Sequence, residues 1–276
     1  MIVSLRSHQG LTLIELILVI VIIGILATLT SSFLSLGSRM YTETADRDKL
    51  LSQSRFALER LTRELRNAIP NSVRVHSAAG RCIEFVPVEV ASRYTSIPLA
   101  APGKASISFF GLASEWQTLA APGAGVDGYR AYIYATDQTQ IYLTGSGSSP
   151  GRFFEIDSAL FDATTNGFNV TLNFASDIYF AVNSPSNRIY LAKSPVSYCI
   201  NNAGQLHRYA GYEFAATPNL SDGSLMAENL DPSLSTFQVD NPSLSRNSIS
   251  HLVLVFHTTL SGKLFFNQEV HIPNVP

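Results

Sequence analysis

The histidines are the side chains of this sequence best suited to bind a metal or to transfer a proton. Their positions form neither an HExxH pattern nor any other metal-ligand spacing. Two of them, His251 and His257, are an even number of residues apart on an expected strand and could share one of its faces. We therefore expect structural or surface histidines, no metal site and no cofactor. The six histidines are His8, His76, His207, His251, His257 and His271.

Patterns for nucleophilic catalysis and phosphate binding are also missing from the sequence. The GSGSS stretch at Gly145–Ser149 does not match a nucleophile elbow, and its surroundings indicate a flexible loop rather than a strand-to-helix turn. The pairs Asp127–Gly128 and Asp222–Gly223 predict turns, because the further acidic ligands of a calcium site are missing nearby. We expect no catalytic residue, and hence a protein that is not an enzyme.

Two cysteines, Cys82 and Cys199, form a candidate disulfide. They are far apart in the sequence and have no metal-like spacing. In an oxidising compartment the bridge would close a loop long enough to stabilise the fold by up to about 4.7 kcal/mol in the chain-entropy model. Two buried free thiols are the alternative, and only export of the chain would favour the bridge.

One acidic residue, Glu15, stands at the start of a long apolar segment. Residues 16–38 carry no charged side chain, and at about 1.5 Å per residue such a helix can cross a hydrocarbon core of about 30 Å. A carboxylate in that setting is costly alone but tolerable beside a positive partner. The sequence therefore predicts a membrane-spanning helix whose acid makes docking to a positively charged group favourable.

Two ordinary kinds of apolar segment compete with this interpretation. The small residues at Thr28–Ser32 weakly resemble the cut site of a secretory signal peptide, and a plain single-pass anchor is the other alternative. A helical pattern continues without proline as far as Pro70, which favours one long helix over a removed signal. A plain anchor gives no reason for an acid at its start.

The residues around Glu15 resemble a known processing site. Gly10 is followed by LTLIEL, which is similar to the Phe-TLIEL sequence that follows the processed Gly in type IV pilins and type II secretion pseudopilins, with Leu11 in place of Phe. In that family a membrane aspartyl protease, the prepilin peptidase, cuts after the Gly and methylates the new terminal amine. The resemblance implies cleavage after Gly10, N-methylation of Leu11, and pairing of Glu15 with the amine of a neighbouring subunit during assembly.

The segment after the apolar stretch predicts an amphipathic continuation of the same helix. Apolar residues recur there at helical spacing among charged ones, and Pro70 places the end of the helix near residues 67–69. The apolar positions are Leu51, Leu58, Leu61, Leu65 and Ile69. The expected parts of the chain are a leader peptide 1–10, a transmembrane and assembly helix 11–36, its amphipathic continuation 37–69, and a periplasmic β-rich globular domain 70–276.

Downstream of Pro70 the hydrophobic period changes from helical to alternating. One long helix followed by many strands predicts an α+β, pilin-like fold in which the helix packs on antiparallel sheet. The loop-rich stretches Ala113–Gly128, Gly145–Gly151 and Pro218–Ser248 are expected surface insertions. The expected strands are Ser72–His76, Cys82–Val90, Ala105–Phe110, Tyr129–Tyr134, Phe168–Phe174, Ile178–Val182, Arg188–Ala192, Val196–Ile200, His251–Thr258 and Lys263–Ile272.

Composition limits the partners of the chain. With 19 basic and 21 acidic residues the net charge is -2, so there is no electrostatic footprint for nucleic acid. A charged fraction of 14%, against roughly 25% in ordinary soluble domains, fits an exported β-rich protein. Packing explains most of a mid-chain aromatic cluster, with a sugar-binding or partner-binding surface as the alternative. The cluster comprises Phe109, Phe110, Trp116, Tyr129, Tyr132 and Tyr134.

Further segments narrow the family resemblance. Arg55–Val75 resembles the J-type pseudopilins and W-type minor pilins; with Ser197–Tyr212 and the ending HIPNVP, it looks most similar to the O-type minor pilins of mannose-sensitive haemagglutinin (MSHA) pili. The resemblance implies a single-pass inner-membrane subunit with a periplasmic body, an orientation that Arg6 also favours. Such a minor pilin would join other minor and major pilins at the inner-membrane assembly platform, prime the filament and sit at its tip. The rivals are a J-type pseudopilin of a type II secretion system and a tip adhesin that binds surface glycans.

Overall fold

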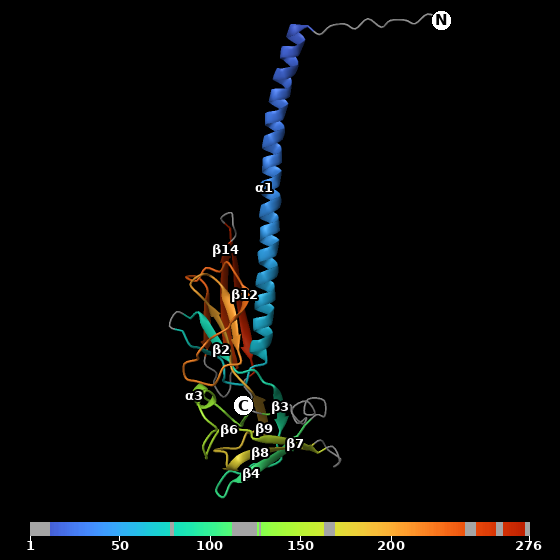
Figure 1. The fold of residues 1–276 in the computed structure, drawn as a ribbon. Helices are drawn as coiled ribbons and strands as arrows, with labels where there is room; N and C mark the ends of the chain where they lie inside the picture. The colour runs from blue at the N-terminus through green and yellow to red at the C-terminus, as the bar shows by residue number, and fades with distance from the viewer. Residues whose placement is uncertain are drawn as a thin grey trace, which may run out of the picture. The chain divides into compact units, whose positions relative to one another are not determined.

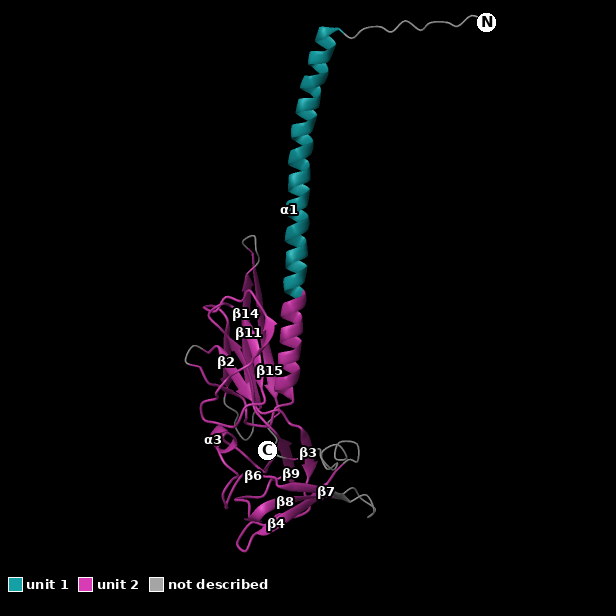
Figure 2. Ribbon diagram, in the orientation of Figure 1, with its two compact units in different colours: residues 1–51 teal, residues 52–276 magenta. Residues whose placement is uncertain are grey.

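The computed structural model describes residues 12–77, 80–111, 126, 128–162, 169–240, 247–257 and 262–273 of the 276-residue chain. Within these residues it has one long helix, one short helix and four antiparallel sheets (Figure 1). The chain divides into two compact units, residues 1–51 and residues 52–276 (Figure 2). The α+β fold predicted from the sequence is confirmed.

Helix α1 (Leu13–Arg66) is a single uninterrupted helix across the apolar and the amphipathic segments. It ends slightly earlier than the sequence suggested, because the N–H groups of Asn67 and Ala68 donate to carbonyls three residues back rather than four. The side chain of Asn67 then donates to the carbonyl of Val88, 2.9 Å away. Basic residues in the last turn suit the negative end of the helix dipole.

The last turns of α1, from Ser52 onward, supply one face of the core of the larger unit. Leu61 and Leu65 are fully buried, whereas Arg55 and Glu59 on the opposite face are exposed. The predicted amphipathic spacing is therefore confirmed in this part of the helix. Glu64 lies at the border of the two faces, where its carboxylate pairs with Arg60 one turn before it and with Arg208 of the sheet, both at 3.0 Å.

The described residues of the body form four sheets, and every strand pairing within them is antiparallel. The largest has the order β1 (Arg74–Val75), β2 (Cys82–Phe85), β10 (Val196–Ile200), β11 (Leu206–Ala210), β12 (Ser224–Ala227). A second has the order β13 (Thr236–Asp240), β14 (Ser248–His257), β15 (Lys263–Ile272). The third is β3 (Val90–Arg93), β9 (Arg188–Ala192), β5 (Arg130–Tyr132), β6 (Phe153–Glu155), and the fourth is β4 (Lys104–Phe110), β8 (Asn169–Ile178), β7 (Ser158–Asp162).

The third and fourth sheets share one hydrophobic core. Phe154 of β6 lies in it, and the rings of Phe174 and Phe180 meet the Phe154 ring edge-on, with centroids 6.2 and 5.0 Å away. A second cluster joins Ile69, which follows α1, to Tyr132 of β5 and to the short helix α3 (Gln138–Ile141). These two clusters hold the segment between β5 and β6 in place from both sides.

Several sequence predictions need correction. The expected strand Cys82–Val90 is two strands: the first ends at Phe85, and Pro87, which has no N–H for a ladder, forms an isolated bridge with Ala68 just after α1. The stretch Pro218–Ser248, expected as an insertion, contains β12 and β13 in its described part. Strands β6, β7 and β11 and helix α3 were not expected at all.

Replacing Leu61 with Ala should destabilise the body by about 2 to 5 kcal/mol, because it leaves a cavity at a fully buried site. Phe56→Ala is the matched control on the same helix, since Phe56 is 55% exposed; its loss should stay below about 0.5 kcal/mol. Denaturant unfolding of the full chain in detergent micelles measures both. Equal decreases in the free energy of unfolding of the two variants would contradict the assigned orientation of the helix.

Candidate functional site

The start of helix α1 carries the acidic residue Glu15, close to the expected processing site. Gly10 and Leu11, the expected cleavage and methylation positions, lie outside the described residues. Glu15 lies in the first turn of α1, its side chain exposed and its N–H donating to the carbonyl of Thr12 at 3.1 Å. A carboxylate in a first turn is favoured by the positive end of the helix dipole. Glu15 therefore places an acidic side chain close to the beginning of the helix.

The apolar segment that follows Glu15 is uncovered. By length and composition α1 is apolar enough to cross a membrane, with a mean hydropathy of 2.8 in its most apolar window and none of that window buried. Ile20, Leu26 and Leu29 are each more than half exposed. Apolar patches of this extent mark a surface that contacts lipid or another protein. The helix is consistent with single-pass membrane anchoring.

Three hydroxyl groups within this segment have partners in the helix itself. Thr28 donates to the carbonyl of Ile25 at 2.8 Å, and Thr30 donates to that of Leu26 at 2.7 Å. Ser32 continues the pattern by donating to the carbonyl of Thr28. Because an unpaired hydroxyl is costly in hydrocarbon, these bonds suit the segment to an apolar environment.

The structure joins Cys82 of β2 to Cys199 of β10 in a disulfide, the first of the two states that the sequence left open. The two cysteines are directly opposite in the antiparallel register, with Cα atoms 4.2 Å apart and a sequence separation of 117 residues. The bridge thus fastens an early strand to a late one in the middle of the five-stranded sheet.

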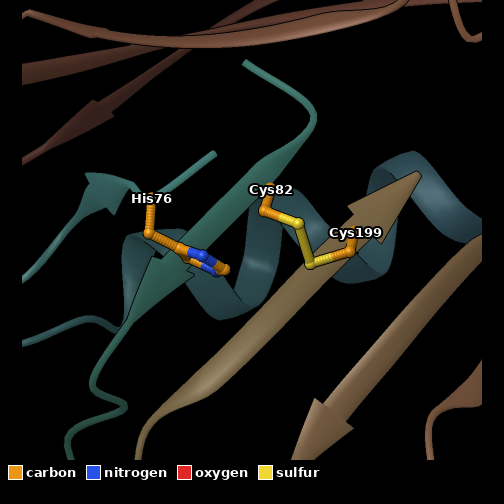
Figure 3. A group of neighbouring side chains, drawn as sticks. All are labelled: His76, Cys82 and Cys199. Carbon is orange, nitrogen blue, oxygen red and sulfur yellow. A yellow bond between two sulfur atoms is a disulfide. The ribbon is translucent and has the colours of Figure 1, made fainter. Parts of the chain in front are cut away.

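His76 lies beside this disulfide, with a ring nitrogen within 4.8 Å of both sulfur atoms (Figure 3). The trio does not form a metal site in this state, since metals bind cysteine as the thiolate and both sulfurs are bonded to each other. Burial lowers the pKa of His76, an effect that the carboxylate of Glu84 opposes and the guanidinium of Arg74 reinforces. The ring is therefore neutral at neutral pH.

His76 also begins a buried chain of hydrogen bonds that sequence reasoning missed. The phenol of Tyr212 donates to the carboxylate of Glu84 at 2.8 Å, and Glu84, fully buried, pairs with Arg74 at 2.5 Å. Because the single phenol proton is used there, Ser197 donates to the Tyr212 oxygen, 2.6 Å away. The Ser197 oxygen then accepts from Nε2 of His76 at 3.3 Å.

The direction of these bonds excludes a nucleophilic role for Ser197. A catalytic base must accept the serine proton, whereas His76 donates toward Ser197. Ser197 is also fully buried, so no substrate reaches its hydroxyl. Burial and the neighbouring Glu84 raise the pKa of Tyr212, which keeps its proton in place. The cluster is structural: it neutralises the buried carboxylate of Glu84 and ties β1, β2 and β10 to the loop after β11.

His251 and His257 are paired with acidic side chains, as structural or surface histidines would be. His251 and His257 do share one face of β14, as their spacing suggested. The two ring nitrogens of His251 lie 3.4 Å from carboxylate oxygens of Asp240 and Glu269, and His257 lies 3.0 Å from Asp231. His8 lies outside the described residues.

The mid-chain aromatic residues do not form one surface. Phe109 and Tyr132 are buried, in two different clusters of the core. Tyr129 and Tyr134 are partly buried against the core of the third and fourth sheets, whereas Phe110 is 53% exposed. Trp116 lies outside the described residues. Packing thus accounts for most of the described members.

Comparison with known protein families places a match at the N-terminal end of the chain. The model of the prokaryotic N-terminal methylation motif matches residues 5–31, a stretch that contains Glu15 and most of the apolar segment. It supports a type IV pilin or pseudopilin, a family whose members are structural rather than catalytic. No curated protein and no solved structure matches the chain.

Removing the disulfide should lower the stability of the body substantially. The chain-entropy model gives up to about 4.7 kcal/mol for a loop of this length, so the double variant Cys82→Ala, Cys199→Ala should unfold at a clearly lower temperature. A thiol reductant is the control: it should lower the melting temperature of the wild-type chain and leave the double variant unchanged. A wild-type melting temperature that is insensitive to the reductant would argue against the bridge.

Proposed function

We propose that the chain is made as a precursor, is cut by the prepilin peptidase after Gly10, and is assembled into a filament through Leu11 and Glu15. The observation that carries this proposal is that three features lie together at one end of α1. The methylation motif at residues 5–31 falls on the segment where an exposed acid stands in the first turn of an uncovered apolar helix. A plain membrane anchor explains the apolar residues but not the acid.

The energetics favour pairing between subunits. An acidic residue within the apolar region costs about 2.5 to 3.5 kcal/mol on the insertion scale. A positive amine about 4 Å away contributes roughly 4 kcal/mol at an effective dielectric constant of 20, which offsets that cost. Glu15 in an isolated chain thus favours a neighbour that offers a terminal amine. Assembly then moves the apolar helix from lipid into a bundle of similar helices without exposing it to water.

We further propose a minor subunit of an MSHA-type pilus, which primes assembly with other minor pilins and remains at the tip. Two segments support this assignment by resemblance, Arg55–Val75 and Ser197–Tyr212, and they pack against each other: Glu64 of the first pairs with Arg208 of the second at 3.0 Å. The size of the body adds support, because residues 52–276 with four sheets would be difficult to repeat along a thin fibre. The body is then periplasmic before assembly.

The first of these segments, Arg55–Val75, also resembles J-type pseudopilins, so a subunit of a type II secretion pseudopilus is the second candidate. Processing, membrane insertion and the pairing of Glu15 are common to both functions. The genes next to this one discriminate between them, since pilus and secretion components are encoded in different clusters. Partners in either case are other pilins or pseudopilins, the prepilin peptidase and the inner-membrane assembly platform.

Replacing Glu15 with Ala should leave membrane insertion intact and reduce capture of neighbouring subunits about tenfold or more. The acid is lost while the apolar segment is unchanged, so only the interaction with the partner amine disappears. Membrane fractionation measures the first quantity, and co-purification of the other minor subunits after detergent extraction measures the second.

Glu43→Ala is the matched control for this experiment, because Glu43 is an exposed acid on the same helix beyond the apolar segment. It should insert and co-purify as the wild-type chain does. Undiminished co-purification of the Glu15→Ala variant would refute the proposed role of Glu15. Loss of both variants from the membrane would refute the prediction that the apolar segment inserts when an acid on the helix is replaced.

A further inference from the structure

A cavity of about 570 Å³ lies in the body between helix α3 and strand β6, with the segment of residues 143–151 as its wall. The sequence indicated a flexible loop here. The observed loop is fixed by several bonds: the Glu155 N–H donates to the Ser146 carbonyl at 2.9 Å, and the Tyr179 N–H donates to the Ser149 hydroxyl at 2.9 Å. The volume of the cavity is within the range of about 300 to 1,000 Å³ that is usual for sites of small ligands.

Glycines allow this loop to lie directly on β6. A Cβ atom at Gly147 would come within 2.3 Å of the Phe153 carbonyl oxygen, and the residue has φ +91°. A Cβ atom at Gly151 would meet the ring of Phe154 at 2.7 Å. Any side chain at either position would force the loop away from the strand. The glycines are thus explained by close packing.

Arg130 holds the beginning of the same loop. Its guanidinium, almost completely buried, donates to the carbonyls of Leu143 and Gly145 at 2.7 and 2.9 Å. It lies over the rings of Phe153 and Phe214, 4.6 and 4.0 Å from their centroids. Each of these contacts restricts the loop before any ligand arrives, and such preorganisation lowers the entropic cost of binding.

The lining of the cavity has a distinctive chemistry. Among the described residues that form it, the one charged side chain is Arg152. Arg152 donates to the carbonyl of Tyr134 at 3.0 Å and has no ion pair with a carboxylate of the described residues. A partly buried guanidinium without an acidic partner is a site for an anion, preferably a carboxylate that it can bind through two parallel hydrogen bonds.

The uncharged part of the lining suits a polyol. Thr144, Ser146 and Ser148 bring hydroxyl groups, each able to donate and to accept. The amide of Gln140 accepts from the Thr136 N–H at 3.2 Å through its oxygen, which leaves its NH₂ group as a donor. Leu143, 54% exposed, adds an apolar surface of the kind that packs against the C–H face of a sugar ring.

A neighbouring cavity of about 450 Å³ shares Thr144 and Gly145 with the first but differs in charge. Its lining contains two carboxylates, Glu155 and Glu213, together with Lys193 and Arg130. An anionic group is therefore directed to the cavity with Arg152 rather than to this one. Charge thus distinguishes two adjacent hollows on the same surface of the body.

We propose that the cavity walled by residues 143–151 binds a saccharide that carries a carboxylate, with Arg152 on the carboxylate and the hydroxyl-bearing residues on the sugar. This goes beyond the assembly role and is independent of it. A chain with Glu15→Ala should bind the sugar as the wild-type chain does, so the two proposals can fail separately.

Titration of the full chain in detergent micelles with D-glucuronate, followed by ligand-observed NMR, tests the proposal. D-glucuronate should bind with a Kd of about millimolar order, and D-glucose and acetate should each bind about tenfold more weakly, since each lacks half of the contacts. Arg152→Gln should weaken D-glucuronate binding by at least about tenfold.

Ser148→Asp serves as a second variant that leaves the fold alone, because Ser148 is exposed; its new carboxylate should repel the ligand to a similar extent. Arg93→Gln is the control, an exposed arginine that does not line the cavity, and it should bind as the wild-type chain does. The proposal is overturned if D-glucuronate does not bind, if Arg152→Gln and Ser148→Asp bind it normally, or if glucose or acetate binds equally well.

Discussion

An apolar helix surface that the described residues of the chain leave exposed is the constraint on which the rest of this protein depends. The first part of α1 exposes its Leu, Ile and Val side chains and carries one carboxylate in its first turn. Water cannot solvate such a surface without a large hydrophobic cost, so the segment must remain in lipid or among other apolar helices. The methylation motif at residues 5–31 coincides with this segment, so the sequence match and the physical requirement agree.

The body, in contrast, buries the apolar side chains of its core among its own residues. Its last helical turns bury Leu61 and Leu65 in its own core, and the pair Glu64–Arg208 fastens the helix to the five-stranded sheet. Its most costly buried charge, Glu84, is neutralised by Arg74 and by the phenol of Tyr212. The two parts therefore differ in a physical way: the body covers the apolar side chains of its core with its own residues, and the apolar segment leaves its side chains exposed.

Local pattern explains which elements the sequence predicted well. The strands Val196–Ile200 and Lys263–Ile272 have the predicted bounds, because their apolar runs or alternation are bordered by clear turns. The strands β12 and β13 were missed since they are short and lie among Pro, Asn and Ser, which outweigh a weak alternation. The chain of bonds from His76 to Glu84 could not be predicted, because it brings residues 76–84 together with residues 197–212, more than a hundred positions later in the sequence. Gly10 and Leu11 were found by resemblance alone, since a cleavage site is defined by its protease.

Mass spectrometry of the mature protein, purified from membranes of the native cell, tests the central claim most directly. A chain processed for assembly begins at Leu11, carries a methyl group on its terminal amine, and has Glu15 as its fifth residue. A mature chain that still begins at Met1, or that begins after Ser32, would contradict the account, because Glu15 would then lack a processed terminus close by or would be absent altogether.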